Sequence, residues 1–194
     1  VARKARLIDR LPAVRGVYTE NLDLSRVVWF KVGGPAEVVF EPADEYDLRV
    51  FLTEKPDDVP LTVIGAGSNI LVRDGGVRGV VVRLGREFAR VEEDSNHNLR
   101  AGAGALCINV SLTAVEAGLT GLEFMRGVPG TIGGGLRMNA GAFDSDTATV
   151  VSGARALDPT GREHDLSPAD LGFGYRHSAV PEDWIFTAAT LEGV

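Results

Sequence analysis

Glycine is the feature that most constrains what this chain folds into. The 194 residues include 24 glycines, about 12% of the chain against about 7% in average proteins. Glycine is favoured where the backbone takes a left-handed turn, or where another group comes too close for a Cβ atom. Because these glycines gather in a few stretches, those stretches are the candidates for binding sites.

The first cluster is the sequence Gly-Ala-Gly-Ser-Asn at residues 65–69, directly after the apolar run 61–64. Such a loop presents several backbone N–H groups to one anion, and Ser68 and Asn69 add side-chain donors. A dinucleotide fingerprint would have a third glycine where this chain has Ile70, and would continue into a helix. These residues alone support phosphate binding and a plain tight turn equally.

The second cluster runs from Gly127 through Gly130, Gly133, Gly134 and Gly135 to residue 141. Six glycines in these fifteen residues would weaken an ordinary helix by about 1 kcal/mol each. We interpret the stretch as a surface against which a flat or bulky group lies. The alternative is a glycine-lined packing contact between two lobes.

A third segment, residues 173–178, places Arg176 beside Tyr175 with Gly174 before them. Such an arginine can clamp a carboxylate or phosphate and can stabilise a developing oxyanion. Local sequence alone favours a plainer interpretation, in which a surface arginine lies next to a half-buried tyrosine.

Composition excludes several functions. A net charge of −7 without a basic stripe excludes nucleic acid as the expected partner. The three histidines are far apart and Cys107 is the one cysteine, so no metal site is expected. There is no P-loop motif, no serine nucleophile elbow and no apolar run of about 20 residues for a membrane helix. We expect a cytoplasmic monomer.

The residue pattern predicts mixed helices and strands. We expect an amphipathic helix over 1–20, helices over 44–54 and 106–117, and a capped turn over 167–170. Strands are expected over these ranges: 27–32, 37–40, 61–64, 77–84, 89–93, 99–103, 150–157, 162–164 and 184–191.

The order of the motifs along the chain is more specific than any one of them. Five blocks of sequence, at residues 29–36, 65–72, 127–134, 138–143 and 175–178, follow one another. This series closely resembles the UDP-N-acetylenolpyruvoylglucosamine reductase family, from about residue 20 to the end of the chain. The resemblance implies an α+β fold of the vanillyl-alcohol-oxidase (PCMH) type, in which two lobes, here 1–84 and 85–194, clasp FAD.

The resemblance also implies an activity and its residues. Members of the family are FAD-dependent oxidoreductases of peptidoglycan precursor synthesis, in which NADPH reduces a non-covalent FAD that then passes hydride to UDP-N-acetylglucosamine enolpyruvate. Arg176 would be catalytic and would bind the substrate carboxylate, with Tyr175 beside the substrate. The cofactor-binding residues would be Gly65, Ala66, Gly67, Ser68, Asn69, Ile70, Gly127, Pro129, Gly130, Thr131, Gly133, Gly134 and Asn139.

One departure from the family affects the expected activity. The family's C-terminal substrate-binding domain carries a proton-donating serine and a glutamate, and no position here matches either. We therefore expect a truncated form that holds FAD and has weak or no turnover. The alternative from another class is a non-catalytic FAD-binding module of the same fold.

Overall fold

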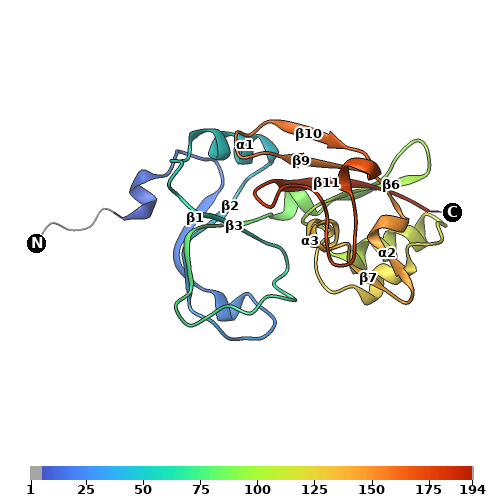
Figure 1. Ribbon diagram of the computed structural model, residues 1–194, viewed down its shortest axis with the longest axis horizontal. Helices are drawn as coiled ribbons and strands as arrows, with labels where there is room; N and C mark the ends of the chain where they lie inside the picture. The colour runs from blue at the N-terminus through green and yellow to red at the C-terminus, as the bar shows by residue number, and fades with distance from the viewer. Residues whose placement is uncertain (1–5, 194) are drawn as a thin grey trace, which may run out of the picture. The chain divides into compact units, whose positions relative to one another are not determined.

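The chain forms two compact units in the computed structural model, which describes residues 6–193 (Figure 1). The first unit comprises the chain up to Gly85 together with Pro159–Gly161, and the second comprises the rest. The expected division fell one residue earlier, after residue 84, and did not include the turn 159–161. That turn groups with the first unit because Arg49 Nε donates to the Gly161 carbonyl over 3.2 Å.

The first unit is built on a four-stranded sheet in the order β1-β2-β4-β3. β1 (Val17–Asp23) is antiparallel to β2 (Pro35–Glu41), whereas β4 (Val77–Arg83) is parallel to both β2 and β3 (Leu61–Ile64). The centre of β4 is three consecutive buried valines, as is typical of a parallel strand that is covered on both faces. The predicted strands over 61–64 and 77–84 are confirmed, and helix α1 (Glu45–Glu54) lies where 44–54 was predicted.

The predicted helix over 1–20 is wrong. Residues 1–5 lie outside the described part of the chain, η1 (Leu7–Arg10) is a single 3-10 turn, and residues 17–20 belong to β1. Tyr18 pairs with Phe40 of β2, with their ring centroids 5.1 Å apart. This pairing with a distant strand overrides the local helical pattern.

The predicted strand over 27–32 is also wrong. η2 (Leu24–Arg26) continues into turns, since Val28 N–H donates to the Leu24 carbonyl and Lys31 N–H donates to the Val28 carbonyl. Lys31 has a φ of 56°, which a strand does not allow. The apolar pattern reflects burial of Val28 in the first unit's core.

The second unit contains an antiparallel five-stranded sheet in the order β10-β9-β11-β6-β5. Helices α2 (Cys107–Glu116) and α3 (Ile132–Met138) pack against this sheet on the same face (Figure 1). Its strands and short flanking segments are η3 (Arg86–Ala89), β5 (Val91–Glu93), β6 (Asn98–Gly102), η4 (Glu123–Gly127), β7 (Gly141–Ala142), β8 (Ser145–Asp146), η5 (Thr147–Thr149), β9 (Val151–Leu157), β10 (Glu163–Leu166) and β11 (Ile185–Glu192).

Most of the second unit follows the sequence pattern. The strands predicted near 89–103, 150–164 and 184–191 are confirmed, as is α2 (Cys107–Glu116), which Gly118 follows with a φ of 73°. α4 (Pro168–Leu171) begins with the expected capping box, in which Ser167 and Asp170 each bond the other's backbone.

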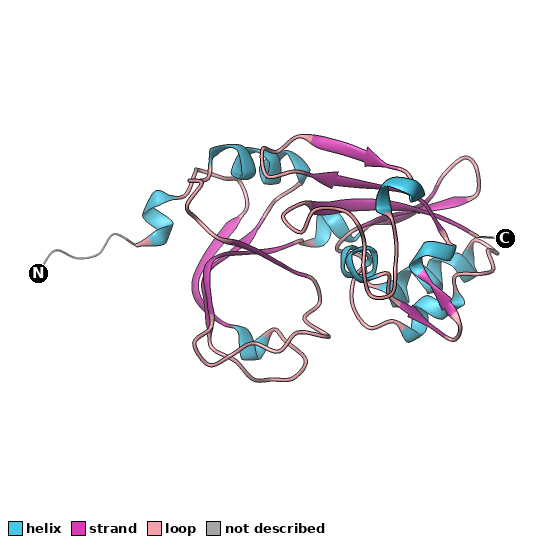
Figure 2. Cartoon of the chain, viewed as in Figure 1, coloured by secondary structure: helices cyan, strands magenta, loops and turns pink. Residues whose placement is uncertain are grey.

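The glycine-rich stretch contains a helix that the sequence did not predict. α3 (Ile132–Met138) includes Gly133, Gly134 and Gly135 (Figure 2). Its buried residues Ile132 and Leu136 face the core, and the helix packs on β11 and β6. Packing of this apolar side compensates for the poor helix propensity of glycine. No helix in residues 6–193 is long and apolar enough to cross a membrane.

Candidate functional site

The first predicted binding loop leaves the carboxyl end of β3 and leads toward β4 (Figure 2). Gly67 is buried with a φ of 67°, and Trp29 N–H donates to its carbonyl over 2.9 Å. A Cβ atom on Gly67 would lie 3.0 Å from Val28 Cα. The fold itself therefore requires glycine at this position.

The same loop leaves many hydrogen-bond donors unpaired. Within residues 6–193, the backbone N–H groups of residues 66–70 donate to no protein acceptor, and the side chains of Ser68 and Asn69 have no partner either. Ile70 is different, since its side chain packs against the first unit's core. Backbone and side-chain donors on one short loop are the chemistry that a pyrophosphate requires.

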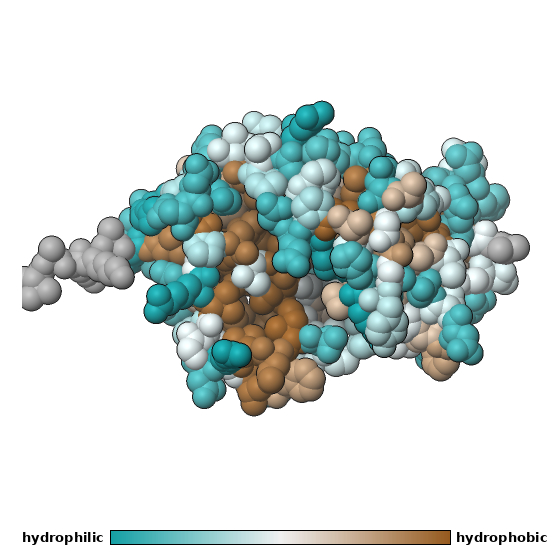
Figure 3. All heavy atoms as spheres, viewed as in Figure 1, coloured by the Kyte–Doolittle hydropathy of each residue, from teal (hydrophilic) through white to brown (hydrophobic). Residues whose placement is uncertain are grey.

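Exposed apolar side chains accompany this loop in the first unit. Trp29 is 60% exposed and Leu71 is 72% exposed, and Phe30 and Val32 are exposed as well. Figure 3 shows hydrophobic atoms gathered on the loop side of this unit. Unpaired donors beside apolar surface suit a ligand that has both an anionic part and aromatic rings.

Several glycines of the second cluster are explained by packing within the second unit. A Cβ atom on Gly127 would lie 2.5 Å from the Phe143 ring, and one on Gly133 would lie 3.2 Å from Ala103 Cβ. Gly130 has a φ of 124°, which disfavours any side chain. The carbonyls of Ala105 and Ala103 accept the N–H groups of residues 132 and 133, respectively.

Gly134 differs from these glycines. It is exposed, and the nearest atom to a Cβ built there is Thr131 Oγ1 at 3.9 Å. Its N–H group has no acceptor in the described part of the chain, and the exposed Met138 lies one helical turn along the same face. No contact in the described part of the chain explains this glycine, and contact between Gly134 and a cofactor stays a prediction. Pro129 is exposed and Thr131 is buried at the start of α3.

The Asn139 side chain is fully occupied by the second unit itself. Its Nδ2 donates to Asp146 Oδ2 over 3.0 Å and to the Gly174 carbonyl over 3.3 Å, while its Oδ1 accepts the Ala148 N–H over 2.9 Å. Contact between Asn139 and a cofactor stays a prediction, and the observed role is structural.

Tyr175 and Arg176 occupy the tip of a two-residue turn. Gly174 and His177 exchange both backbone hydrogen bonds, at 3.0 Å and 3.3 Å. Tyr175 is 93% exposed, and the Arg176 guanidinium lies 5.9 Å from its ring centroid. Arg176 has a φ of 53°, an uncommon conformation for a side chain of this size. Its guanidinium forms no ion pair with a described acidic residue.

The structure adds two residues to those that the sequence singled out. Arg137 of α3 donates to three backbone carbonyls of residues 180–184, and burial lowers its pKa. Ser178, two residues after Arg176, has a buried hydroxyl with no hydrogen-bond partner within residues 6–193. No general sequence motif marks either the contacts of Arg137 or the buried hydroxyl of Ser178.

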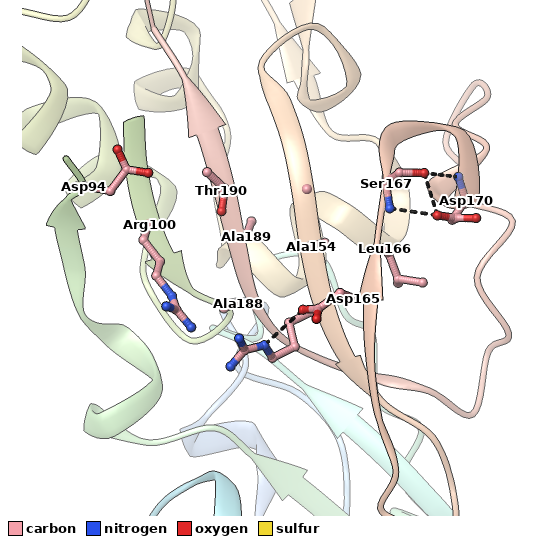
Figure 4. A pocket seen from close by; sticks show the side chains of 12 residues that line it. Asp94, Arg100, Ala154, Asp165, Leu166, Ser167, Asp170, Ala188, Ala189 and Thr190 are labelled. Carbon is pink, nitrogen blue, oxygen red and sulfur yellow. Dashed lines mark hydrogen bonds and ion pairs between the residues drawn. The ribbon is translucent and has the colours of Figure 1, made fainter. Parts of the chain in front are cut away.

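An open depression of about 530 Å³ lies on the sheet of the second unit, away from every predicted site residue. Arg155, whose guanidinium pairs with Asp165, and Arg100 line it around small residues of β9 and β11 (Figure 4). Its walls are charged and open, unlike the enclosed apolar surface of most cofactor pockets.

Two of the histidines, both outside the glycine clusters, pair with carboxylates. His97 pairs with Glu93 and His164 pairs with Asp158. Burial raises the pKa of the Cys107 thiol to about 11, so it stays protonated at neutral pH. Residues 6–193 contain no group of three His, Cys, Asp or Glu side chains that could hold a metal ion.

Comparisons with known proteins identify the family and the fold of the chain. Residues 36–167 match the FAD binding domain family. The chain is 55% identical to a UDP-N-acetylenolpyruvoylglucosamine reductase from Maricaulis maris, over 96% of this chain and 59% of that relative. The crystal structure of such a reductase from Thermus caldophilus matches with a TM-score of 0.79 and 32% identity, over 94% of this chain and 63% of that one.

A more distant structure matches in fold alone. The 6-hydroxy-D-nicotine oxidase from Arthrobacter nicotinovorans has a TM-score of 0.72 and 18% identity, over 93% of this chain and 42% of that one. These matches confirm the predicted α+β FAD-binding fold of the vanillyl-alcohol-oxidase type. The chain spans about 60% of the length of the curated relatives it matches. It belongs to the FAD binding domain family, and over 96% of its length it is similar to the UDP-N-acetylenolpyruvoylglucosamine reductases.

Proposed function

We propose that these residues form the FAD-binding part of an enzyme that reduces UDP-N-acetylglucosamine enolpyruvate to UDP-N-acetylmuramate, with NADPH as the hydride donor. The proposal places the enzyme in peptidoglycan precursor synthesis in the cytoplasm. Its support from comparison is the 55% identity with a reductase of this name over 96% of the chain. The chain covers 59% of that relative, so the proposal concerns the activity of the whole protein.

The observation that carries the proposal is the set of unpaired donors on the loop after β3. The N–H groups of residues 66–70 and the side chains of Ser68 and Asn69 have no acceptor among residues 6–193. Unpaired donors at the carboxyl end of a parallel strand are suited to bind a diphosphate. We assign the FAD pyrophosphate to this loop.

In the second unit we assign the flavin and ribityl part to the exposed face of α3. Gly134 offers a bare backbone there, since the nearest protein atom would lie 3.9 Å from a Cβ atom at this position. The FAD, when bound, supplies the hydride chemistry. We propose non-covalent binding, because the histidines and Cys107 lie outside both glycine clusters and Cys107 is 2% exposed.

Arg176 is the residue that we assign to the substrate. A guanidinium has the geometry to bind a carboxylate through two parallel hydrogen bonds. When the terminal methylene carbon of the enolpyruvyl group accepts hydride, negative charge develops on the carbon beside the carboxylate and spreads into that carboxylate, where a fixed positive charge stabilises it. Arg176 is exposed at a turn tip, as this role requires, and Tyr175 would lie beside the bound substrate.

The first test is an FAD titration of the chain, in which binding is monitored by flavin fluorescence. We expect the double variant Ser68→Ala, Asn69→Ala to bind FAD about tenfold more weakly, because two donors to a charged group are lost. The matched control is Ser95→Ala, Asn96→Ala, the same change on the exposed β5–β6 turn. ADP should compete with FAD for the wild-type chain. Equal FAD affinity in both double variants would contradict the pyrophosphate assignment.

The second test separates an enzyme from a binding module. NADPH is added without oxygen to the FAD-loaded chain, and the visible absorbance of the flavin is followed. Bleaching of that absorbance supports the reductase. Retained FAD that NADPH does not reduce favours the non-catalytic FAD-binding module.

A further inference from the structure

We infer that Asn139 and Arg137, at the C-terminal end of α3, are positioning residues for the turn that presents Arg176. The inference deepens the proposed function and rests on it for the role of Arg176 in binding substrate. The contacts that carry it all lie within the second unit.

Asn139 holds the base of the turn. Its Nδ2 donates over 3.3 Å to the Gly174 carbonyl, which also accepts the His177 N–H that closes the turn. Asp146 Oδ2, at 3.0 Å, and the Ala148 N–H, at 2.9 Å, fix the orientation of the amide. Asn139 also ends α3 with a φ of 41°, a conformation that asparagine tolerates better than most residues. One side chain therefore ends the helix and holds the turn.

Arg137 holds the other end of the same segment. Its Nη1 donates to the Val180 and Pro181 carbonyls over 2.6 and 3.0 Å, and its Nη2 donates to the Trp184 carbonyl over 2.7 Å. The guanidinium also lies 4.9 Å from the centroid of the Phe186 ring. The planar donor fork of arginine reaches several carbonyls at once, which a lysine ammonium on a flexible stem does less well.

The contacts of Asn139 and Arg137 together determine where Arg176 lies. Residues 174–184 have few backbone hydrogen bonds of their own, namely the Gly174–His177 pair, the Ala179 N–H bond to the Leu171 carbonyl and the Trp184 N–H bond to the Pro181 carbonyl. The exposed tip is therefore fixed mainly through α3. Because α3 also carries Gly134, the helix that we assign to the flavin sets the location of the arginine that we assign to the substrate.

The test is limited trypsin digestion of the native chain, with cleavage after Arg176 and after Arg162 quantified by mass spectrometry. Arg162 is exposed just before β10 and belongs to the same unit as Arg176, so it reports general loosening of that unit. Asn139→Gly keeps the left-handed backbone and removes the amide. We expect it to raise the ratio of Arg176 to Arg162 cleavage by about tenfold, and Arg137→Lys to raise it in the same direction.

Two further variants keep the result decisive. Asn139→Asp retains the acceptor for Ala148 N–H but loses the donor to Gly174, so we expect it to resemble the glycine variant. Asn21→Gly, at an exposed left-handed asparagine of the first unit, should leave the ratio unchanged. An unchanged ratio in Asn139→Gly, or an equal rise at both arginines, overturns the inference. This readout needs neither FAD nor substrate, so its failure is distinct from failure of the FAD titration.

Discussion

The two glycine clusters use their glycines in opposite ways. In the first unit, the loop after β3 needs Gly67 for its turn and leaves a row of N–H groups without acceptors among residues 6–193. In the second unit, the richer cluster forms part of a helix, and its glycines at 127 and 133 make room for the protein's own side chains.

The difference shows that the density of glycine does not by itself mark a ligand site. A glycine that meets its own protein is explained by folding, whereas Gly134 meets nothing closer than 3.9 Å. A ligand contact is indicated by a glycine without an internal reason, or by backbone donors without acceptors. Substitutions at these positions can break this comparison.

The largest effect is expected for Gly67→Val. The variant places a β-branched residue at a φ of 67° with its Cβ 3.0 Å from Val28 Cα. We expect the free energy of unfolding of the first unit to fall by about 3 kcal/mol, as measured by urea denaturation. Loss of FAD binding in this variant would then report unfolding rather than a missing contact.

Gly75→Val is the matched control for that loss. Gly75 belongs to the same unit, has no protein atom within 4 Å of a built Cβ, and is not left-handed. We expect a change below about 0.5 kcal/mol. If Gly67→Val were as stable as Gly75→Val, the loop would not owe its shape to Gly67.

Gly133→Val should have the next largest effect. The first atom of the new side chain lies 3.2 Å from both the Cβ and the carbonyl oxygen of Ala103. Overpacking of this kind should lower the free energy of unfolding of the second unit by about 2 kcal/mol. The same denaturation series measures it, and an unchanged midpoint would mean that α3 shifts away from β6 at little cost.

Cys107 tests how tightly the second cluster is packed. Its N–H donates to the Gly130 carbonyl over 3.0 Å, and burial raises the thiol pKa to about 11. The folded pKa exceeds the unfolded value of about 8.5. The contribution of the thiol to the stability of the folded state is therefore fully present below pH 8.5 and is lost as the pH rises through 11. We expect the free energy of unfolding of the second unit to decrease by about 1 kcal/mol between pH 7 and pH 9.

The measurement is urea denaturation of the second unit between pH 7 and pH 9. Cys107→Ala removes the titrating thiol and should remove most of this slope. A slope that persists in Cys107→Ala would assign the alkaline loss to another group.

Local signals predicted the parts of the fold that depend on neighbours in sequence. The capped turn at residues 167–170, the helix α2 and the neighbouring strands β9 and β10 were all predicted from the sequence. β1 was missed because its stability comes from β2, whose residues pair with it from 12 to 24 positions away. α3 was missed because burial of Leu136 outweighs the propensity of its glycines.

The candidate site was predictable to a similar degree. Glycines followed by Ser68 and Asn69 marked the loop as a candidate without deciding between anion binding and a plain turn. Arg176 was singled out by the family resemblance, although its neighbours alone favoured a surface role. Arg137 was not, because an arginine among apolar residues carries no motif and its carbonyl partners lie 43 to 47 residues away. Sequence also does not distinguish Gly133, which folding requires, from Gly134, which it does not.

The smallest effect on stability is expected for Gly134→Ala, and it has the opposite sign. A methyl group there meets only Thr131 Oγ1 at 3.9 Å, and alanine favours the helix, so the second unit should gain about 0.5 kcal/mol. We nevertheless expect weaker FAD binding, since the methyl group would enter the space that we assign to the flavin.

The matched variant Gly135→Ala lies on the buried side of α3 in ordinary contact with Thr147. Both variants are compared by thermal melting and FAD titration. If Gly134→Ala bound FAD as tightly as Gly135→Ala, the exposed face of α3 would not contact the flavin, and the two clusters would differ only in how they fold.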